Sequence, residues 1–296
     1  MTPTFRAEQS FPDNMVYTFG DKKYDLSSRT FIMGIFNITP DSFSDGGKYF
    51  NTGLNSERLL ADALKMESDG ADFFDIGGES TRPGSGSISL EEELDRVIPV
   101  IHILKQNTDL PISIDTYKSK VAEEALKAGA VIVNDISGFK FDPLIAGVTS
   151  KYNASSILMH IQGTPKDMQK DPQYDDVVWE VSQYLKESAS IAMNSGIKQI
   201  ILDPGIGFGK DLEHNLLLIK NISSLCEIGF PVLIGTSRKS FLNKIHPTPM
   251  EERLEGSIAS AVCAVMNGAC IVRTHDVAET KRAMRVVDAV KSVRYK

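Results

Sequence analysis

Polar or charged side chains end eight short apolar segments, and these side chains are the first candidates for chemistry. They are Asn37, Asp75, Asp115, Asn134 with Asp135, His160, Asp203, Ser237, and Arg273 with His275. A single aspartate after a strand is more often a turn former or a helix cap than a catalytic group. The joint pattern favours a site if the strands form a barrel, because active sites of that fold lie where the carboxyl ends of the strands meet. Arg273 and His275 are two residues apart, so on one strand they point the same way and can share a ligand.

The glycine-rich segment LDPGIGFGK (202–210) invites interpretation as a nucleotide-binding loop, but its spacing is wrong. Three residues separate Gly205 from Gly209, whereas a P-loop needs four, and Lys210 is followed by Asp211 rather than serine or threonine. The third glycine of a GxGxxG motif is also misplaced. The glycines therefore indicate a close approach of the backbone to a ligand.

The elements that must position these side chains alternate between short runs rich in isoleucine and valine and longer segments of helical period, the pattern of a parallel sheet covered by helices. The predicted strands are 31–37, 72–78, 111–115, 131–135, 155–160, 199–203, 231–235 and 270–275. The predicted helices are 56–69, 90–105, 118–128, 143–152, 177–194, 213–222, 250–267 and 276–293. Eight such units favour a (β/α)8 TIM barrel over an open doubly wound sheet. Two short runs, 15–19 and 22–26, predict a β-hairpin before the barrel.

Composition fits one large core, because 42% of the 296 residues are hydrophobic and 24% are charged. We assign residues 1–14 to an N-terminal extension and residues 15–296 to one barrel domain. The net charge of −7 comes without a basic run, so no nucleic-acid partner is expected. An export signal and a run of about 18 apolar residues are both missing, which predicts a cytoplasmic protein with no membrane partner.

Covalent and metal-cluster chemistry are not expected. Cys226, Cys263 and Cys270 are odd in number and lack metal-ligand spacing, so they are expected to be reduced, small apolar side chains. The sequence pairs no serine, cysteine or lysine with a positioned base, so a covalent intermediate has no evident nucleophile.

Eight segments, each at the end of a predicted strand, together resemble dihydropteroate synthase, a pterin-binding TIM-barrel family. They are MGIFNITPDSFSDGG (33–47), GGESTRPGS (77–85), SIDT (113–116), NDISG (134–138), LMHIQGTP (158–165), LDPGIGFGK (202–210), GTSRKSF (235–241) and RTHD (273–276). The resemblance runs from about residue 16 to the C-terminus. It implies a transferase that condenses 6-hydroxymethyl-7,8-dihydropterin pyrophosphate with 4-aminobenzoate, giving 7,8-dihydropteroate and pyrophosphate.

The resemblance also implies which residues hold the pterin. A pterin presents an edge of N–H donors, so a selective pocket must offer buried acceptors, and Asp115, Asn134 and Asp203 meet that need. Lys239 would lie near the ring carbonyl and a ring nitrogen, and Met159 would be a further substrate contact. Two ordinary alternatives stay open, in which Asn134 forms an Asx-turn and Asp115 caps the following helix.

The anionic end of that substrate would lie against three matched residues. The resemblance implies that Arg273 stacks on the pterin and contacts pyrophosphate, while His275 holds pyrophosphate oxygens. A planar guanidinium suits both tasks better than an ammonium. Asn37 would bind Mg²⁺, for which its amide oxygen is a suitable hard ligand; the alternative is that Asn37 merely ends its strand.

The second substrate would be held by residues from three connections. In the family, a mobile loop closes over the pyrophosphate and builds the aminobenzoate pocket together with the loop carrying Asp41 to Gly47. Phe208 would pack on the aminobenzoate ring, and backbone N–H groups at a predicted helix start would attract its carboxylate. The matched residues are Thr81, Arg82, Pro83, Phe208 and Ser240.

The implied mechanism is positioning and electrostatics. Mg²⁺, Arg82, Arg273 and His275 would neutralise the leaving pyrophosphate. Asp115 and Asp203 would favour a cation on the pterin, and Lys239 completes the catalytic set. An aniline is unprotonated at neutral pH and needs no strong base.

Two other functions remain open to the sequence. A methyltetrahydrofolate methyltransferase domain shares the fold, but it handles no pyrophosphate and has no reason to keep ESTRPGS, GTSRKSF and RTHD together. A catalytically silent pterin-binding module is the second. The resemblance further implies a homodimer, and the apolar stretch 254–266 fits a helix buried on two sides, although barrel packing alone could explain it.

Overall fold

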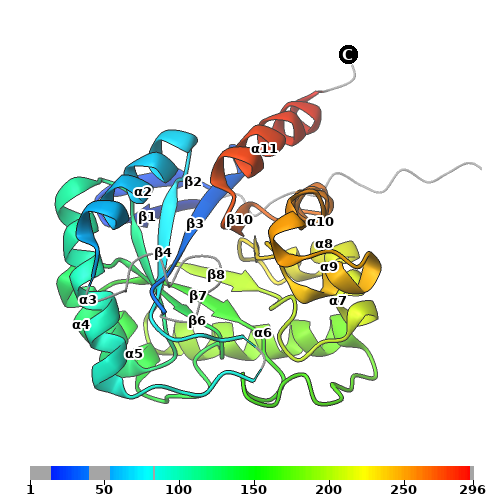
Figure 1. The fold of residues 1–296 in the computed structure, drawn as a ribbon. Helices are drawn as coiled ribbons and strands as arrows, with labels where there is room; N and C mark the ends of the chain where they lie inside the picture. The colour runs from blue at the N-terminus through cyan, green and yellow to red at the C-terminus, as the bar shows by residue number, and fades with distance from the viewer. Residues whose placement is uncertain (1–14, 40–53, 83, 294–296) are drawn as a thin grey trace, which may run out of the picture.

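The computed structural model describes residues 15–39, 54–82 and 84–293, in which a ring of helices surrounds eight parallel strands (Figure 1). The strands are β3 (Phe31–Asn37), β4 (Phe73–Gly77), β5 (Ile112–Asp115), β6 (Ile132–Asp135), β7 (Ser155–Met159), β8 (Ile200–Asp203), β9 (Leu233–Ile234) and β10 (Ile271–Thr274). The helices are α2 (Ser56–Asp69), α3 (Leu90–Asn107), α4 (Ser119–Ala128), α5 (Ile145–Lys151), α6 (Val177–Asn194), α7 (Leu212–Lys220), α8 (Ile222–Cys226), α9 (Ser240–Ile245), the 3-10 helix η1 (Met250–Glu252), α10 (Leu254–Met266) and α11 (Val277–Ser292).

The sheet curls into a nearly closed barrel. Its strands lie in the order β8-β7-β6-β5-β4-β3-β10-β9, each parallel to its neighbours. A parallel bridge between Leu202 and Val232 brings the two ends of this order together. The carboxyl ends of all eight strands therefore face one mouth of the barrel.

Alternation along each strand divides the core into two shells. Ile32 and Phe36 of β3 belong to the large cluster between strands and helices, whereas Phe31 and Met33 belong to a second cluster inside the barrel. Successive side chains of a strand point to opposite faces, so this parity continues to the strand end. Asn37 shares the parity of Phe31 and Met33 and therefore faces the barrel interior.

The N-terminal hairpin covers the other end of the barrel. It consists of β1 (Val16–Phe19) and β2 (Lys22–Asp25), paired antiparallel. Phe19 is 2% exposed and packs edge-on against Phe73 of the inner cluster. The hydroxyl of Tyr17 donates a hydrogen bond of 2.8 Å to the carbonyl of Ile200. Access to the polar strand ends is therefore from the opposite mouth.

The predicted barrel and hairpin are confirmed, with changes in three helical segments. The predicted helix 213–222 is two helices, α7 and α8, which meet at Asn221, the C-cap of one and the N-cap of the other. The predicted helix 250–267 is η1 followed by α10, with Arg253 between them. Helix α9 is an additional short helix that begins at Ser240, where a helix start was predicted.

Three sequence expectations lie outside the described residues. They concern the extension 1–14, the loop from Asp41 to Gly47, and Pro83. Among the described helices, none is both long enough and apolar enough to cross a membrane.

Candidate functional site

The inward parity selects which strand-end side chains reach the barrel mouth. In seven of the eight strands, an inward residue that comes before the strand end belongs to the inner apolar cluster. The inward positions at the strand ends are Asn37, Asp75, Asp115, Asn134, Met159, Asp203, Gly235, Arg273 and His275. A polar layer therefore lies directly above the apolar layer inside one barrel.

Arg273 is the centre of the polar layer. Its Nε donates to Asp75 Oδ2 at 2.5 Å, and its Nη2 donates to Asp115 Oδ2 at 2.8 Å. Asn134 Nδ2 also donates to Asp75 Oδ2, at 3.0 Å. Asp75 is fully buried, so the guanidinium compensates a carboxylate that water cannot reach.

Two carboxyls of this layer, Asp115 and Asp203, have raised pKa values because they are buried. Burial raises the pKa of Asp115 to about 7, although the neighbouring Arg273 lowers it in part. Burial likewise raises the pKa of Asp203, against the opposing charges of Lys239 and Arg273. Burial lowers the pKa of the Lys239 ammonium to about 8, while Asp203 opposes the shift. Ionisable groups with shifted pKa values in one mouth indicate a functional site.

His275 occupies the side of the mouth next to Asn37. Its Nε2 lies 3.3 Å from Asn37 Nδ2, and its Nδ1 lies 3.0 Å from Ser237 Oγ. Burial lowers the pKa of His275 to about 3, and the charges of Arg238, Arg273 and Arg82 lower it further. The imidazole is therefore neutral at neutral pH and surrounded by cations, an arrangement suited to an anion.

The segment after β8 forms a tight turn under Asp203. Asp203 Oδ1 accepts the N–H of Gly205 at 2.7 Å. Gly205 has a φ of +67°, and a Cβ built there would lie 1.9 Å from the His160 carbonyl oxygen. The buried ammonium of Lys210 donates to the carbonyls of Gly205 and Phe208 at 3.0 and 2.8 Å, which holds the turn from below. Gly205 thus permits a close approach of the backbone to the His160 carbonyl, while the approach to a ligand stays a prediction.

An apolar wall adjoins the polar layer. Met159 is 4% exposed and belongs to a small cluster with Ile136, Ile161 and Met168, against which Phe208 packs. The ammonium of Lys239 lies 4.7 Å from the centre of the Phe208 ring and donates to the carbonyl of Ile206. The mouth can therefore hold a flat ring between apolar and polar sides.

The connection between β4 and α3 crosses the mouth. Figure 1 shows it, in cyan, passing over strand ends toward α6 before it returns to α3. The N–H of Gly84 donates to the carbonyl of Pro165, which follows β7, at 3.0 Å. Thr81 and Arg82 are half-buried on this connection. The positive charge of Arg82 contributes to the lowered pKa of His275, so this charge acts at the same mouth. Pro83 lies outside the described residues.

The remaining predicted position is Ser240, which is exposed at the first residue of α9. Lys239, not Ser240, is the N-cap residue, and it makes no side-chain capping bond. Ser240 therefore does not cap this helix.

Sequence reasoning gave no role to three residues that organise the site. Asp75 and Ser237 were recognised only as strand ends, although they orient Arg273 and His275. Lys210 has no role in the sequence analysis beyond its place in the glycine-rich segment 202–210, which does not match a nucleotide-binding loop. Conversely, Asp135 has outward parity and accepts the N–H groups of Ser137 and Phe139, so it is a turn former. The parity within each strand was the signal that separates these cases.

Comparisons with known proteins agree with this geometry. Residues 33–275 match the family of pterin binding enzymes. A dihydropteroate synthase of Clostridium beijerinckii is 46% identical over 92% of this chain and 98% of its own, and one of Escherichia coli K12 is 45% identical over 90% and 94%. Solved structures agree as well. A Yersinia pestis dihydropteroate synthase with a sulfonamide drug complex has a TM-score of 0.89, 43% identity, and coverage of 94% of this chain and 100% of its own. A Xanthomonas albilineans dihydropteroate synthase with 4-aminobenzoic acid has a TM-score of 0.86, 41% identity, and coverage of 94% and 99%.

The Gly205 turn predicts a stability difference between two glycines of similar backbone conformation. Gly229 also has a positive φ, +99°, but no atom lies within 4 Å of a Cβ built there. Gly229→Ala should therefore cost only the left-handed penalty of roughly 1–2 kcal/mol. Gly205→Ala adds a backbone collision and should lower the free energy of unfolding, measured in urea, by more. Equal losses for the two variants would show that the contact with His160 is not a constraint.

Proposed function

The chain belongs to the dihydropteroate synthase family of pterin-binding enzymes, and we propose how the residues at its barrel mouth divide the work of that family's reaction. It is a transferase that condenses 6-hydroxymethyl-7,8-dihydropterin pyrophosphate with 4-aminobenzoate, yielding 7,8-dihydropteroate and pyrophosphate in folate biosynthesis. The assignment of roles rests on one observation, the polar layer around Arg273. Hydrogen-bond acceptors lie on one side of this layer, and the neutral His275 lies among cations on the other side.

The acceptor side binds the pterin. Asp115, Asn134 and Asp203 offer carboxylate and amide oxygens to the N–H groups of the ring. Arg273 has its edge held by two carboxylates, which leaves its flat face for stacking on the ring. Lys239 donates toward the ring carbonyl, and Met159 supplies an apolar contact. Because strands carry most of these groups, the ring is held in a fixed orientation.

The other side binds pyrophosphate. Arg82 and Arg273 supply positive charge, and His275 acts as a neutral hydrogen-bond donor because burial and three arginines lower its pKa to about 3. This refines the sequence expectation that His275 neutralises charge.

Mg²⁺ would bind at Asn37. The amide nitrogen of Asn37 contacts His275, and its oxygen faces Gly77, 3.9 Å from a Cβ built there, so a hard oxygen donor lies beside the anion-facing side. The described residues contain no group of three His, Cys, Asp or Glu side chains able to hold a metal, which fits an ion held by one protein ligand and by phosphate oxygens. When bound, Mg²⁺ would supply charge neutralisation for the departing pyrophosphate.

4-Aminobenzoate binds on the outer side of the mouth. Its ring packs on Phe208, and its carboxylate lies at the start of α9, near Ser240. Thr81 and Arg82 complete this pocket, and Pro83, which lies outside the described residues, is a further predicted contact.

Bond exchange then needs no covalent enzyme intermediate. The C–O bond from the exocyclic methylene to pyrophosphate breaks, and the carboxylates of Asp115 and Asp203 stabilise positive charge on the pterin. The unprotonated aniline nitrogen forms the new C–N bond and then loses a proton to solvent. Positioning and preorganised charge supply the rate enhancement.

Conversion of Asp203 to asparagine tests this assignment. Asparagine keeps an acceptor for the Gly205 N–H but loses the negative charge, so pterin affinity and turnover should fall roughly ten- to a hundredfold, equivalent to about 1.5–3 kcal/mol. The assay mixes purified protein, both substrates and Mg²⁺ and follows pyrophosphate and dihydropteroate. Asp109→Asn is the matched control, because that side chain is 90% exposed.

Three outcomes of this assay would contradict the account. If wild type releases no pyrophosphate, the synthase function is wrong for this chain, and transfer of a methyl group from methyltetrahydrofolate or pterin binding alone would be tested next. If Asp203→Asn stays within a few-fold of wild type, the role of that carboxylate is wrong. An equal loss in Asp109→Asn would point to a general effect of charge.

The pKa values of the free enzyme predict a bell-shaped pH profile. Protonation of Asp115 removes an acceptor, and its pKa of about 7 is raised, so kcat/KM should fall as pH decreases below about 7. Lys239 loses its proton above a lowered pKa of about 8, so kcat/KM should also fall as pH rises past that value. The measurement is kcat/KM for the pterin substrate from pH 5.5 to 9.5. A flat profile would show that neither group titrates in this range.

A homodimer in the cytoplasm completes the proposal. Helix α11 exposes Val286 and Val290 at 65% and 58%, one turn apart on the same stripe, and the C-cap residue Val293 is 77% exposed. Such a stripe is typical of a helix that packs on a second copy. Light scattering coupled to gel filtration should give twice the chain mass for wild type and one chain mass for Val290→Asp. A monomeric wild type would refute the dimer.

A further inference from the structure

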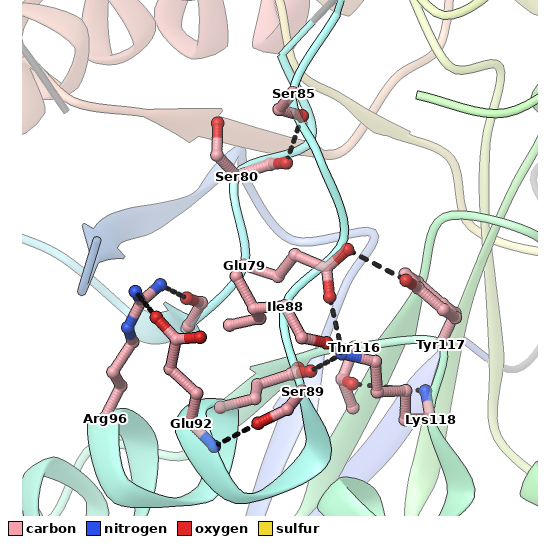
Figure 2. Close-up of polar contacts among 12 residues, drawn as sticks. Glu79, Ser80, Ser85, Ile88, Ser89, Glu92, Arg96, Thr116, Tyr117 and Lys118 are labelled. Atoms are coloured by element: carbon pink, nitrogen blue, oxygen red, sulfur yellow. Dashed lines mark hydrogen bonds and ion pairs between the residues drawn. The ribbon is translucent and has the colours of Figure 1, made fainter. Parts of the chain in front are cut away.

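Lys118, just before α4, joins three parts of the chain. Figure 2 shows it among residues of the β4–α3 connection and of α3. Its Nζ donates to Glu79 Oε2 at 2.6 Å, to Glu93 Oε2 at 2.7 Å and to the carbonyl of Ile88 at 2.9 Å. An ammonium has three donors, so these contacts use all of them.

The cluster is shielded from solvent. The side chains of Glu79 and Glu93 are 7% and 1% exposed, and that of Lys118 is 19% exposed. Burial raises the pKa of Glu93, and the Lys118 charge opposes that shift. The partners of a buried ion pair must stay close together, because a partner that moved away would leave an uncompensated buried charge.

Glu79 and Ile88 stand at the two ends of the connection that carries Thr81 and Arg82. Between them, Ser85 Oγ donates to the carbonyls of Ser80 and Arg82, so the interior of the connection is folded on itself. Arg96 Nη1 also donates to the carbonyl of Gly78 at 2.8 Å, just before Glu79. One ammonium therefore fixes the separation of the two ends.

A second contact ties the same carboxylate to the pterin side. Tyr117 donates its hydroxyl to Glu79 Oε1 at 2.8 Å, and its ring packs against the cluster of Met159 and Ile136. Tyr117 and Lys118 also lie only two and three residues after Asp115 in the chain. The strand that supplies a pterin ligand thus continues into the residues that hold the connection.

We propose that Lys118, through Glu79 and Ile88, is a positioning residue that holds the β4–α3 connection so that Thr81 and Arg82 stay at the barrel mouth. This rests on the proposed function, in which Arg82 serves pyrophosphate and the aminobenzoate pocket. The cluster affects the steps that use Arg82 and Thr81. Binding of the pterin ring does not depend on it, because strand-borne groups hold the ring.

Glu79→Ala is the main test, because Lys118 keeps its ion pair with Glu93 and is not left as an unpaired buried charge. The KM for 4-aminobenzoate should rise about tenfold, as expected for loss of roughly 1.4 kcal/mol. The Kd of 6-hydroxymethylpterin, which lacks pyrophosphate, should stay within about twofold, a change of only roughly 0.4 kcal/mol. Hydrogen exchange of backbone amides in residues 79–89 should become faster. Glu124→Ala is the matched control, because its partner Lys127 lies on the same helix, α4, and both are partly exposed.

Tyr117→Phe provides a second, milder variant that removes only one hydroxyl. It should shift the same KM in the same direction, by less than Glu79→Ala. The proposal is overturned if Glu79→Ala matches Glu124→Ala in KM and hydrogen exchange, or if pterin affinity falls as much as aminobenzoate affinity. Failure of the synthase function itself would appear separately, as absence of pyrophosphate release by wild type.

Discussion

The compensation of buried charge inside the barrel is the constraint on which the rest of the site depends. Asp75, Asp115 and Asp203 lie at the strand ends with little or no access to water. Unpaired carboxylates in such a place would cost several kcal/mol each. Arg273 compensates two of them directly, and Lys239 acts on the third. The barrel mouth can therefore keep charged groups in fixed places before any substrate binds, which electrostatic catalysis requires.

The alternation of strand side chains makes this polar layer compatible with a stable fold. The inner apolar cluster, which includes Phe31, Phe73 and Ile201, fills the barrel below it, and the hairpin covers the far end. The large outer cluster between strands and helices contributes most of the hydrophobic stabilisation. The charged inward side chains are then confined to the strand ends. Function is concentrated there because packing already accounts for the other positions.

Much of this arrangement could be predicted from the sequence. The strand-end pattern and hydrophobic periodicity are local signals, and they gave the barrel, the hairpin and the side of the site. The two-residue period could also have separated Asn134, which faces inward, from Asp135, which does not. Contacts between distant segments were not predictable in this way. The partnership of Arg273 with Asp75 depends on how strands β10 and β4 curve toward each other across β3, and no spacing encodes that distance.

The Lys118 cluster shows why the two halves of the site need different support. Groups on strands are positioned by the hydrogen bonds of the barrel, so Asp115 and Asn134 need few further contacts to keep their direction. Thr81 and Arg82 lie on a connection between β4 and α3, where no strand pairing fixes the backbone. A buried ammonium between Glu79, Glu93 and the Ile88 carbonyl replaces that pairing with three directional contacts. A reaction that depends on positioning needs both halves held equally well, and here one strand end, β5, contributes to each.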